Sequence, residues 1–252
     1  MQGTGNRFGE VAAVYDDARP GYPPEVSAAI ASYVEYVERP LETVAEIGAG
    51  TGHGTAVLLG LGAPVTCVEP DARMAAVLQA RYPAVTVVAP FERWVPPPGG
   101  VSLLGCAMAW HWLDPETRAR RAFDAITPGG TLAVFGHRYA YADPAHEAAI
   151  DAAFRSVRDD GVRPRPDTWA RDDIASAGLF TDVELVRMGR ELPMTTEAYL
   201  RLVRTFGPFR ARTPQEQETL LAALARTLDG LGGGTTLDLR TTVTLARRAE
   251  TA

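Results

Sequence analysis

Short apolar runs alternate with longer segments of helical periodicity through the first half of this chain. Five runs have the length and composition of buried strands, at residues 43–47, 65–68, 85–88, 101–106 and 131–136. Regular alternation of strand and helix is typical of βα units, in which helices connect parallel strands. The pattern therefore predicts an α/β fold built on a doubly wound, mostly parallel sheet.

Proline, glycine and acidic residues mark the ends of the helices expected between these strands. Asp71 begins one helix and Pro83 ends it. Asp114 opens another helix, and the Pro-Gly-Gly run at 128–130 ends it. An earlier helix is expected from residues 23–25 to about residue 37, with its apolar side chains on one face.

The regular alternation stops after residue 136. Helical segments are expected at 144–158, 168–177, 196–205 and 214–228, with strands near 182–188 and 235–245. The last strand is expected to be antiparallel and to lie at the edge of the sheet. Because 252 residues fit one large domain, the sequence predicts a single domain with seven strands.

The composition excludes several classes of chemistry. All 25 basic residues are arginines, which excludes lysine Schiff bases, Ser-Lys hydrolases and a phosphate-loop lysine. The net charge of −6 opposes a nucleic-acid partner. Cys67 and Cys106 lie in apolar stretches, so we expect buried thiols and no metal site. Neither a signal-peptide core nor a membrane-spanning stretch is evident, which predicts a cytoplasmic protein without a membrane partner.

A glycine-rich loop follows the first strand, in the sequence TVAEIGAGTGHGT at 43–55. Glycines there let the backbone approach a ligand closely. Dinucleotide binding requires G-x-G-x-x-G, but the third glycine is replaced by His53 when counted from Gly48 and by Thr55 when counted from Gly50. Glu46 at the strand end would repel a pyrophosphate but can accept hydrogen bonds from an ammonium group. The loop therefore favours an amino-acid-like ligand.

A second acidic residue follows the second strand. Glu69 lies 21 positions after Gly48, where doubly wound folds read ribose hydroxyls. Pro70 and Met74 provide apolar cover, and Phe91 can supply the other wall for a purine. Together with the loop, these residues indicate a ligand that joins a nucleoside to an amino acid.

The segments EIGAGTGHGT, VEPDARM, APFERW, AMAWHWLDP and ITPGGTLAVFG, in this order, resemble the class I S-adenosylmethionine-dependent methyltransferases over residues 7–136. VYDDARPGYP and AWHW are similar to the small-molecule subgroup that includes trans-aconitate methyltransferase-like proteins. One departure is Val101-Ser102, where that subgroup has Phe-Asp. The resemblance implies a Rossmann-like fold, S-adenosylmethionine as cofactor, and methyl transfer to an O, N or C nucleophile of a secondary metabolite or organic acid.

The resemblance also implies roles for parts of the chain. Residues 1–40 would form an N-terminal helical lid, 41–137 the cofactor-binding core, and 138–252 a part with a substrate lid and edge strands. Tyr15 would cover the donor, and Arg19 would pair with its carboxylate or else lie in solvent. The other expected cofactor contacts are Glu46, Gly48, Ala49, Gly50, Glu69, Pro70, Met74, Phe91 and Ala107.

Histidines and aromatic residues are the candidates for the acceptor side, because ligands lie beyond the carboxyl ends of the strands. His111 is the candidate catalytic base, or else a ring packed between two tryptophans to shape the pocket. The expected substrate contacts are Tyr22, Trp110, His137, Tyr199 and Phe206, of which Tyr199 and Phe206 are either lid or core residues.

Other functions remain open from the sequence. The same donor could serve a cyclisation or another reaction without methyl transfer, or the chain could be a non-catalytic subunit with the same fold. The missing third glycine disfavours a NAD-type oxidoreductase. The arginines of 118–121 could bind a macromolecule, although such a run more often forms the exposed surface of a helix. The chain is expected to be a monomer or a homodimer.

Overall fold

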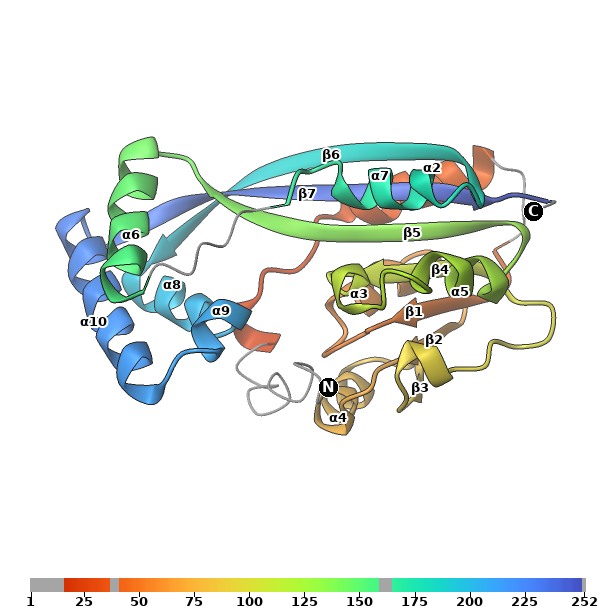
Figure 1. The fold of residues 1–252 in the computed structure, drawn as a ribbon, viewed down its shortest axis with the longest axis horizontal. Helices are drawn as coiled ribbons and strands as arrows, with labels where there is room; N and C mark the ends of the chain where they lie inside the picture. Colours follow the sequence, from red (N-terminus) through yellow and green to blue (C-terminus); the bar gives the residue numbers. More distant parts are fainter. Residues whose placement is uncertain (1–15, 37–40, 159–164, 251–252) are drawn as a thin grey trace.

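The computed structural model describes residues 16–36, 41–158 and 165–250. They form a seven-stranded sheet flanked by helices, with strand order β3-β2-β1-β4-β5-β7-β6 (Figure 1). The pairs from β3 to β5 are parallel, and β7 runs antiparallel to both β5 and β6. The predicted α/β fold with a mostly parallel sheet of seven strands is confirmed.

The elements follow the predicted order along the chain. The strands are β1 (Val44–Ile47), β2 (Val65–Val68), β3 (Val85–Val87), β4 (Val101–Ala107), β5 (Ile126–Tyr141), β6 (Phe180–Thr195) and β7 (Gly234–Arg248). The α-helices are α2 (Pro24–Tyr36), α3 (His53–Leu59), α4 (Ala72–Arg81), α5 (Arg118–Ala125), α6 (Pro144–Val157), α7 (Trp169–Ser176), α8 (Thr196–Val203), α9 (Gly207–Arg210) and α10 (Pro214–Gly230). Two 3-10 turns are η3 (Phe91–Arg93) and η4 (Trp110–Trp112). None of the helices in the described ranges is long and apolar enough to cross a membrane.

Apolar clusters hold helices on both faces of the sheet. Ile30 of α2 and Leu58 of α3 pack in one cluster, and Phe123 of α5 and Ile174 of α7 pack in the other. The start of α4 follows the sequence signal, because the Asp71 side chain accepts a hydrogen bond from the Arg73 backbone.

Strand β5 is much longer than the predicted 131–136. It continues to Tyr141 because β7 pairs with it from Thr131 to Tyr141, which satisfies its backbone groups. Strands β5, β6 and β7 extend well past the short parallel strands, and α6, α8, α9 and α10 gather around their far end (Figure 1). These helices have an apolar core of their own, which includes Ile150 and Leu224.

The last strand is not at the edge of the sheet, so that prediction is wrong. β7 lies between β5 and β6, and β6 forms the edge. The burial of the two strands explains the order: Leu237, Leu239, Val243 and Leu245 of β7 are fully buried, whereas most of β6 is partly or fully exposed. An apolar strand gains more from two neighbours than a polar one.

The strand order fixes where chemistry can occur. Along one edge of the sheet, Glu69 follows β2, Gly48 follows β1 and Met108 follows β4, while His137 lies on the β5 extension. Neighbouring strands are about 4.8 Å apart. These residues therefore form a row, and ligands of open α/β sheets bind along such an edge.

Candidate functional site

A cavity of about 770 Å³ opens along this row of residues. Its size falls in the ordinary range for small-molecule sites. Nine of the predicted cofactor contacts line it: Arg19, Gly48, Ala49, Gly50, Glu69, Pro70, Met74, Phe91 and Ala107. Of the predicted substrate contacts, Tyr22 and His137 line it. Glu46, Trp110, His111, Tyr199 and Phe206 are not part of the wall, and Tyr15 lies outside the described residues.

The glycine loop forms the floor of the cavity in a backbone conformation that favours glycine. Gly48 and Gly50 have φ values of 64° and 59°, in the left-handed region. A Cβ atom on Gly48 would also overlap the Cβ of Ala109, which follows β4. The loop can lie close to both strands only because this position carries no side chain.

Glu69 joins the end of β2 to the glycine loop. Its Oε2 accepts a hydrogen bond from the Gly50 backbone N–H at 2.8 Å, and its Oε1 accepts one from the Asp71 N–H at 2.9 Å. Burial raises the pKa of Glu69, while the bonds from Asp71 and Gly50 act against the rise. A carboxylate oxygen has room for more than one donor. Glu69 can therefore shape the loop and still accept hydroxyl groups from a ligand.

Glu46 lies behind the cavity wall rather than in it. Its carboxyl is fully buried, its Oε2 accepts a hydrogen bond from the Thr55 hydroxyl, and its Oε1 packs against Gly54, where a Cβ would overlap it. Burial raises the pKa of Glu46 to about 8, with a smaller opposing effect from Thr55. A neutral carboxyl behind Gly54 differs from the ammonium acceptor predicted from the sequence.

Replacing Glu46 by Gln should weaken the dependence of stability on pH. The folded-state pKa is about 8 against a usual 4.5, so the stability of the wild type is fully present below pH 4.5 and falls as pH rises toward 8. One such group changes the free energy of unfolding by at most about 1.4 kcal/mol per pH unit. Urea denaturation at several pH values should show a smaller slope for Glu46→Gln, while Glu42→Gln, at an exposed position, keeps the wild-type slope. Equal slopes in all three proteins would contradict the neutral carboxyl.

His137 lies on the cavity wall at the β5 end of the row. Its Nδ1 lies 2.8 Å from the Thr241 Oγ1 of β7, and its ring stacks on Tyr22 with centroids 4.2 Å apart. Burial, and then the charge of Arg190, lower the pKa of His137 to about 4. The imidazole is therefore neutral near pH 7, and it ties the segment before α2 to the extended strands.

His111 and its two tryptophans form the turn η4, in which the His111 ring packs against that of Trp112 with centroids 4.5 Å apart. Trp112 lines the cavity although 53% of it is exposed, and Trp110 is buried. His111 is outside the wall, and burial, together with Arg165 and Arg118, lowers its pKa to about 4. Of the two candidate histidines, His137 lines the cavity and His111 does not, and His53 of the glycine loop lines it as well.

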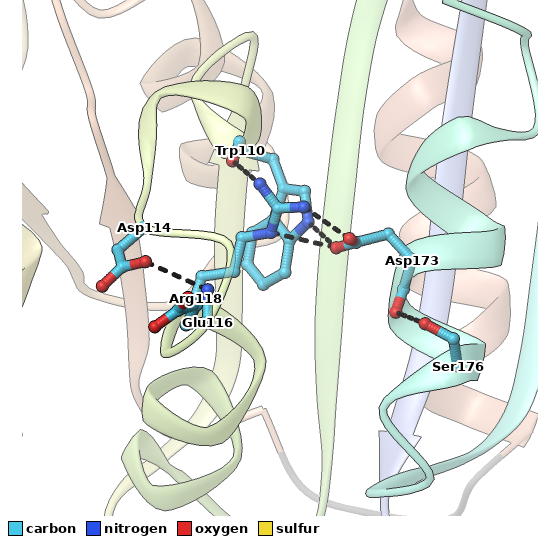
Figure 2. Close-up of polar contacts among 6 residues, drawn as sticks. All are labelled: Trp110, Asp114, Glu116, Arg118, Asp173 and Ser176. Carbon is cyan, nitrogen blue, oxygen red and sulfur yellow. Dashed lines mark hydrogen bonds and ion pairs between the residues drawn. The ribbon is translucent and has the colours of Figure 1, made fainter.

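A partly buried ion pair holds this turn (Figure 2), and neither of its residues lines the cavity. Arg118 of α5 pairs with Asp173 of α7 and donates a hydrogen bond to the Trp110 carbonyl at 3.3 Å. The Trp110 indole Nε1 donates to Asp173 Oδ2 at 2.8 Å. Both the backbone and the side chain of Trp110 are thus fixed by charged groups on two helices.

Replacing Asp173 by Asn should destabilise the protein by about 1–2 kcal/mol, because a nearly buried Arg118 loses its counter-ion. The loss stays below that of a fully buried pair, since Asp173 is partly exposed and the amide oxygen still accepts one bond. Asp172→Asn on the same helix is the matched control and should change the free energy of unfolding by less than about 0.5 kcal/mol. Chemical denaturation measures both, and equal values for the two variants would refute a stabilising pair.

Two predicted substrate contacts, Tyr199 and Phe206, belong to the apolar cluster that α6, α8, α9 and α10 form at the far end of β5, β6 and β7. Tyr199 is buried among α6, α8, α9 and α10, which we call the distal helices, and its hydroxyl forms a hydrogen bond with that of Tyr141. Phe206 packs against Tyr139 and under the Arg19 guanidinium, 5.2 Å from its ring centroid. Arg19 donates to the Thr205 hydroxyl at 2.8 Å and to the Tyr139 hydroxyl at 3.2 Å. Phe206 therefore lies behind two residues of the cavity wall, Arg19 and Tyr139.

Several wall residues were not predicted as ligand contacts from the sequence, and three of them are Thr51, Tyr139 and Trp112. Thr51 in the glycine loop lines the cavity, and its buried hydroxyl has no hydrogen-bond partner among the described residues. Tyr139 lies two residues after His137 on β5, and Trp112 two residues after Trp110. If the predicted strand had been extended to residue 141, Tyr139 would have been expected on the same face as His137, because alternate residues of a strand share one face. For Trp112 the sequence contains no such signal.

Comparison with known proteins identifies the family. The methyltransferase domain family matches residues 45–134. An uncharacterised methyltransferase of Bacillus pumilus is 31% identical over 153 residues, which cover 58% of this chain and 72% of that protein. An uncharacterised methyltransferase of Mycobacterium tuberculosis is 33% identical over 126 residues, covering 50% of this chain and 49% of its own length. This chain thus spans about half the length of the mycobacterial relative. The chain belongs to the class I S-adenosylmethionine-dependent methyltransferases.

Solved structures share the fold. A protein assigned as a type II methyltransferase of Anaeromyxobacter dehalogenans aligns with a TM-score of 0.64 at 23% identity, covering 91% of this chain and 96% of that one. The YcgJ protein of Bacillus subtilis aligns with a TM-score of 0.54 at 15% identity, covering 87% and 97%. The long β5 and the distal helices are thus part of a fold that matches over nearly the whole chain.

The wall residues fit S-adenosylmethionine, the cofactor of this family. The glycine loop has no side chains at Gly48 and Gly50, and Thr51 presents a buried hydroxyl with no hydrogen-bond partner within the described ranges. Glu69, after the neighbouring strand β2, offers acceptor oxygens. Met74 and Phe91 add apolar surface beyond Glu69. A ligand with an amino-acid end, two ribose hydroxyls and a purine matches this order of groups.

Proposed function

We propose that this chain transfers a methyl group from S-adenosylmethionine to a small molecule with an O, N or C nucleophile, a secondary metabolite or an organic acid. The proposal rests on one continuous cavity whose two ends are lined by different kinds of side chain. Gly48, Gly50 and Glu69 line the end over β1 and β2, and Tyr22 and His137 line the end beyond β4. Donor and acceptor can thus lie side by side along the sheet edge.

The proposed chemistry needs little beyond alignment. The bound donor supplies an electrophilic methyl group on a sulfonium, and transfer is an in-line displacement that depends mainly on positioning. Glu69 and the glycine loop would orient the donor, and the wall at Tyr22, Trp112 and His137 would orient the acceptor. Neutral His137 is the form that can accept a proton from a hydroxyl or amine acceptor. His111 lies outside the wall and would act on the reaction through the ring of Trp112, which it contacts with centroids 4.5 Å apart.

The finer placement, in the subgroup with trans-aconitate methyltransferase-like proteins, is part of the proposal. It rests on the segments VYDDARPGYP and AWHW. Arg19 and Tyr22 of the first segment and Trp112 of the second line the same cavity, which supports a shared use of the two segments in acceptor binding.

The experiment is an incubation with S-adenosylmethionine carrying a deuterated methyl group and a panel of phenols, carboxylic acids and amines. The proposal predicts S-adenosylhomocysteine and one product whose mass has increased by one labelled methyl group. A product with no label, formed from the acceptor or from the donor alone, would instead support a reaction such as cyclisation. Donor binding without any turnover across the panel would favour a non-catalytic role.

A further inference from the structure

Trp112 is unusual among the large apolar side chains of the cavity wall. It is 53% exposed, whereas Phe91 at the donor end is 4% exposed. A large aromatic side chain left half in solvent loses much of the free energy that burial would provide. Exposed aromatic surface inside a cavity is what a ligand can cover on binding.

The acceptor end is the part of the cavity beyond β4, and its other lining side chains also include aromatic and polarisable ones. Tyr22, Met108 and Tyr139 line the same cavity as Trp112, and Arg19, which donates a hydrogen bond to the Tyr139 hydroxyl, lines it as well. The carboxylates of the described wall, those of Glu69, Asp71 and Glu92, all follow β2 or β3 at the opposite end of the row. The acceptor end therefore offers ring faces, a thioether and the Arg19 guanidinium, and none of the carboxylates of the described wall lies there to hold a cationic group.

The position of Trp112 is set by the turn η4 and by two charged residues, Arg118 and Asp173, that do not line the cavity. Its backbone N–H donates to the Ala109 carbonyl at 2.8 Å, which closes the turn η4. The turn begins at Trp110, whose indole donates to Asp173 and whose carbonyl accepts from Arg118 (Figure 2). The Arg118 guanidinium also lies over the rings of Trp110 and Trp169, at 5.6 and 5.1 Å from their centroids. Asp173 thus fixes the start of the turn whose end enters the cavity.

We infer that the acceptor is a planar, aromatic or conjugated molecule that stacks on Trp112, and that Asp173 and Arg118 are positioning residues for this contact. The inference rests on the proposed function, since it concerns the acceptor end of the same cavity. Stacked aromatic pairs gain about two- to tenfold in affinity beyond the area that they bury. A saturated molecule of the same size has no such gain.

The test compares 2-naphthol with decahydro-2-naphthol, which share a carbon skeleton and a hydroxyl group and differ in planarity. Calorimetry is done on the full chain saturated with S-adenosylhomocysteine. The expected result is binding of 2-naphthol about two- to tenfold tighter than binding of the saturated alcohol. Trp112→Ala should abolish this preference, and Trp112→Phe should keep part of it. Equal binding of the two alcohols, or no binding of either, would overturn the inference while the bound S-adenosylhomocysteine leaves the proposed function standing.

The positioning role has its own readout. With 5-fluorotryptophan incorporated, the ¹⁹F spectrum can be assigned by single Trp→Phe variants. Asp173→Asn should shift the Trp110 and Trp112 resonances, leave that of Trp94 in place and reduce the preference for 2-naphthol, with unchanged affinity for S-adenosylhomocysteine. An unmoved Trp112 resonance, or an unchanged preference, would overturn the positioning role. Failure of S-adenosylhomocysteine to bind the wild type would instead refute the proposed function.

Discussion

Replacing Glu69 by Ala is expected to weaken S-adenosylmethionine binding by about 2–4 kcal/mol, a loss of roughly thirtyfold to several hundredfold. The carboxylate would contribute in two ways. It would accept the ribose hydroxyls of the donor, and it also accepts the Gly50 N–H at 2.8 Å and the Asp71 N–H at 2.9 Å. The variant therefore loses a ligand contact and the constraint on the loop that forms the cavity floor.

Calorimetric titration of the donor measures this loss, with Glu116→Ala at an exposed position as the control. Glu69→Gln should also bind weakly, because both oxygens of Glu69 accept backbone donors and a Gln amide must turn its own N–H₂ toward one of them. Wild-type affinity for the donor in Glu69→Ala would mean that the donor does not bind at the carboxyl ends of β1 and β2.

Replacing Gly48 by Ala is expected to destabilise the protein by about 2–4 kcal/mol and to abolish donor binding at ordinary concentrations. Two effects add at this position. The φ of 64° is strained for any residue with a Cβ, and that Cβ would overlap the Cβ of Ala109. Relief of the overlap would separate the glycine loop from the segment after β4, which widens the floor of the cavity.

Gly62→Ala is the matched control for Gly48→Ala. Gly62 has a φ of 81°, and a Cβ there would meet no atom within 4 Å. It should therefore cost only the backbone strain of about 1 kcal/mol and leave donor binding unchanged. Thermal denaturation and calorimetry compare the two variants. If both lose the same stability and keep donor affinity, the close approach of the loop to Ala109 is not important.

The donor end of the site could be predicted from the sequence because its signals are local. The glycine spacing after β1 and the distance from Gly48 to Glu69 follow from the βα repeat, and both residues line the cavity. Glu46 is close in sequence to these residues and was expected to contact the ligand, but it lies behind the cavity wall. The sequence could not show that Gly54 permits the Glu46 carboxyl to pack beneath the loop.

The acceptor end depends on contacts between distant parts of the chain. The extension of β5, which brings Tyr139 to the cavity, requires pairing with β7 about a hundred residues later. Arg118 belongs to a run of arginines typical of a helix surface, yet it is 6% exposed because Asp173 of α7 pairs with it. Asp173 and Arg118 hold Trp110 in its buried position by hydrogen bonds, and the turn that follows places Trp112 at the cavity. No local spacing could distinguish the two tryptophans.

The most direct test of the donor site is thermal and chemical denaturation of the full chain with S-adenosylmethionine, S-adenosylhomocysteine and NAD in turn. A ligand that binds only the folded state, at about 100 times its dissociation constant, adds about 2.7 kcal/mol to the free energy of unfolding. We expect this stabilisation with the two adenosyl compounds and none with NAD. Stabilisation by NAD, or by none of the three, would contradict a donor site formed by the glycine loop and Glu69.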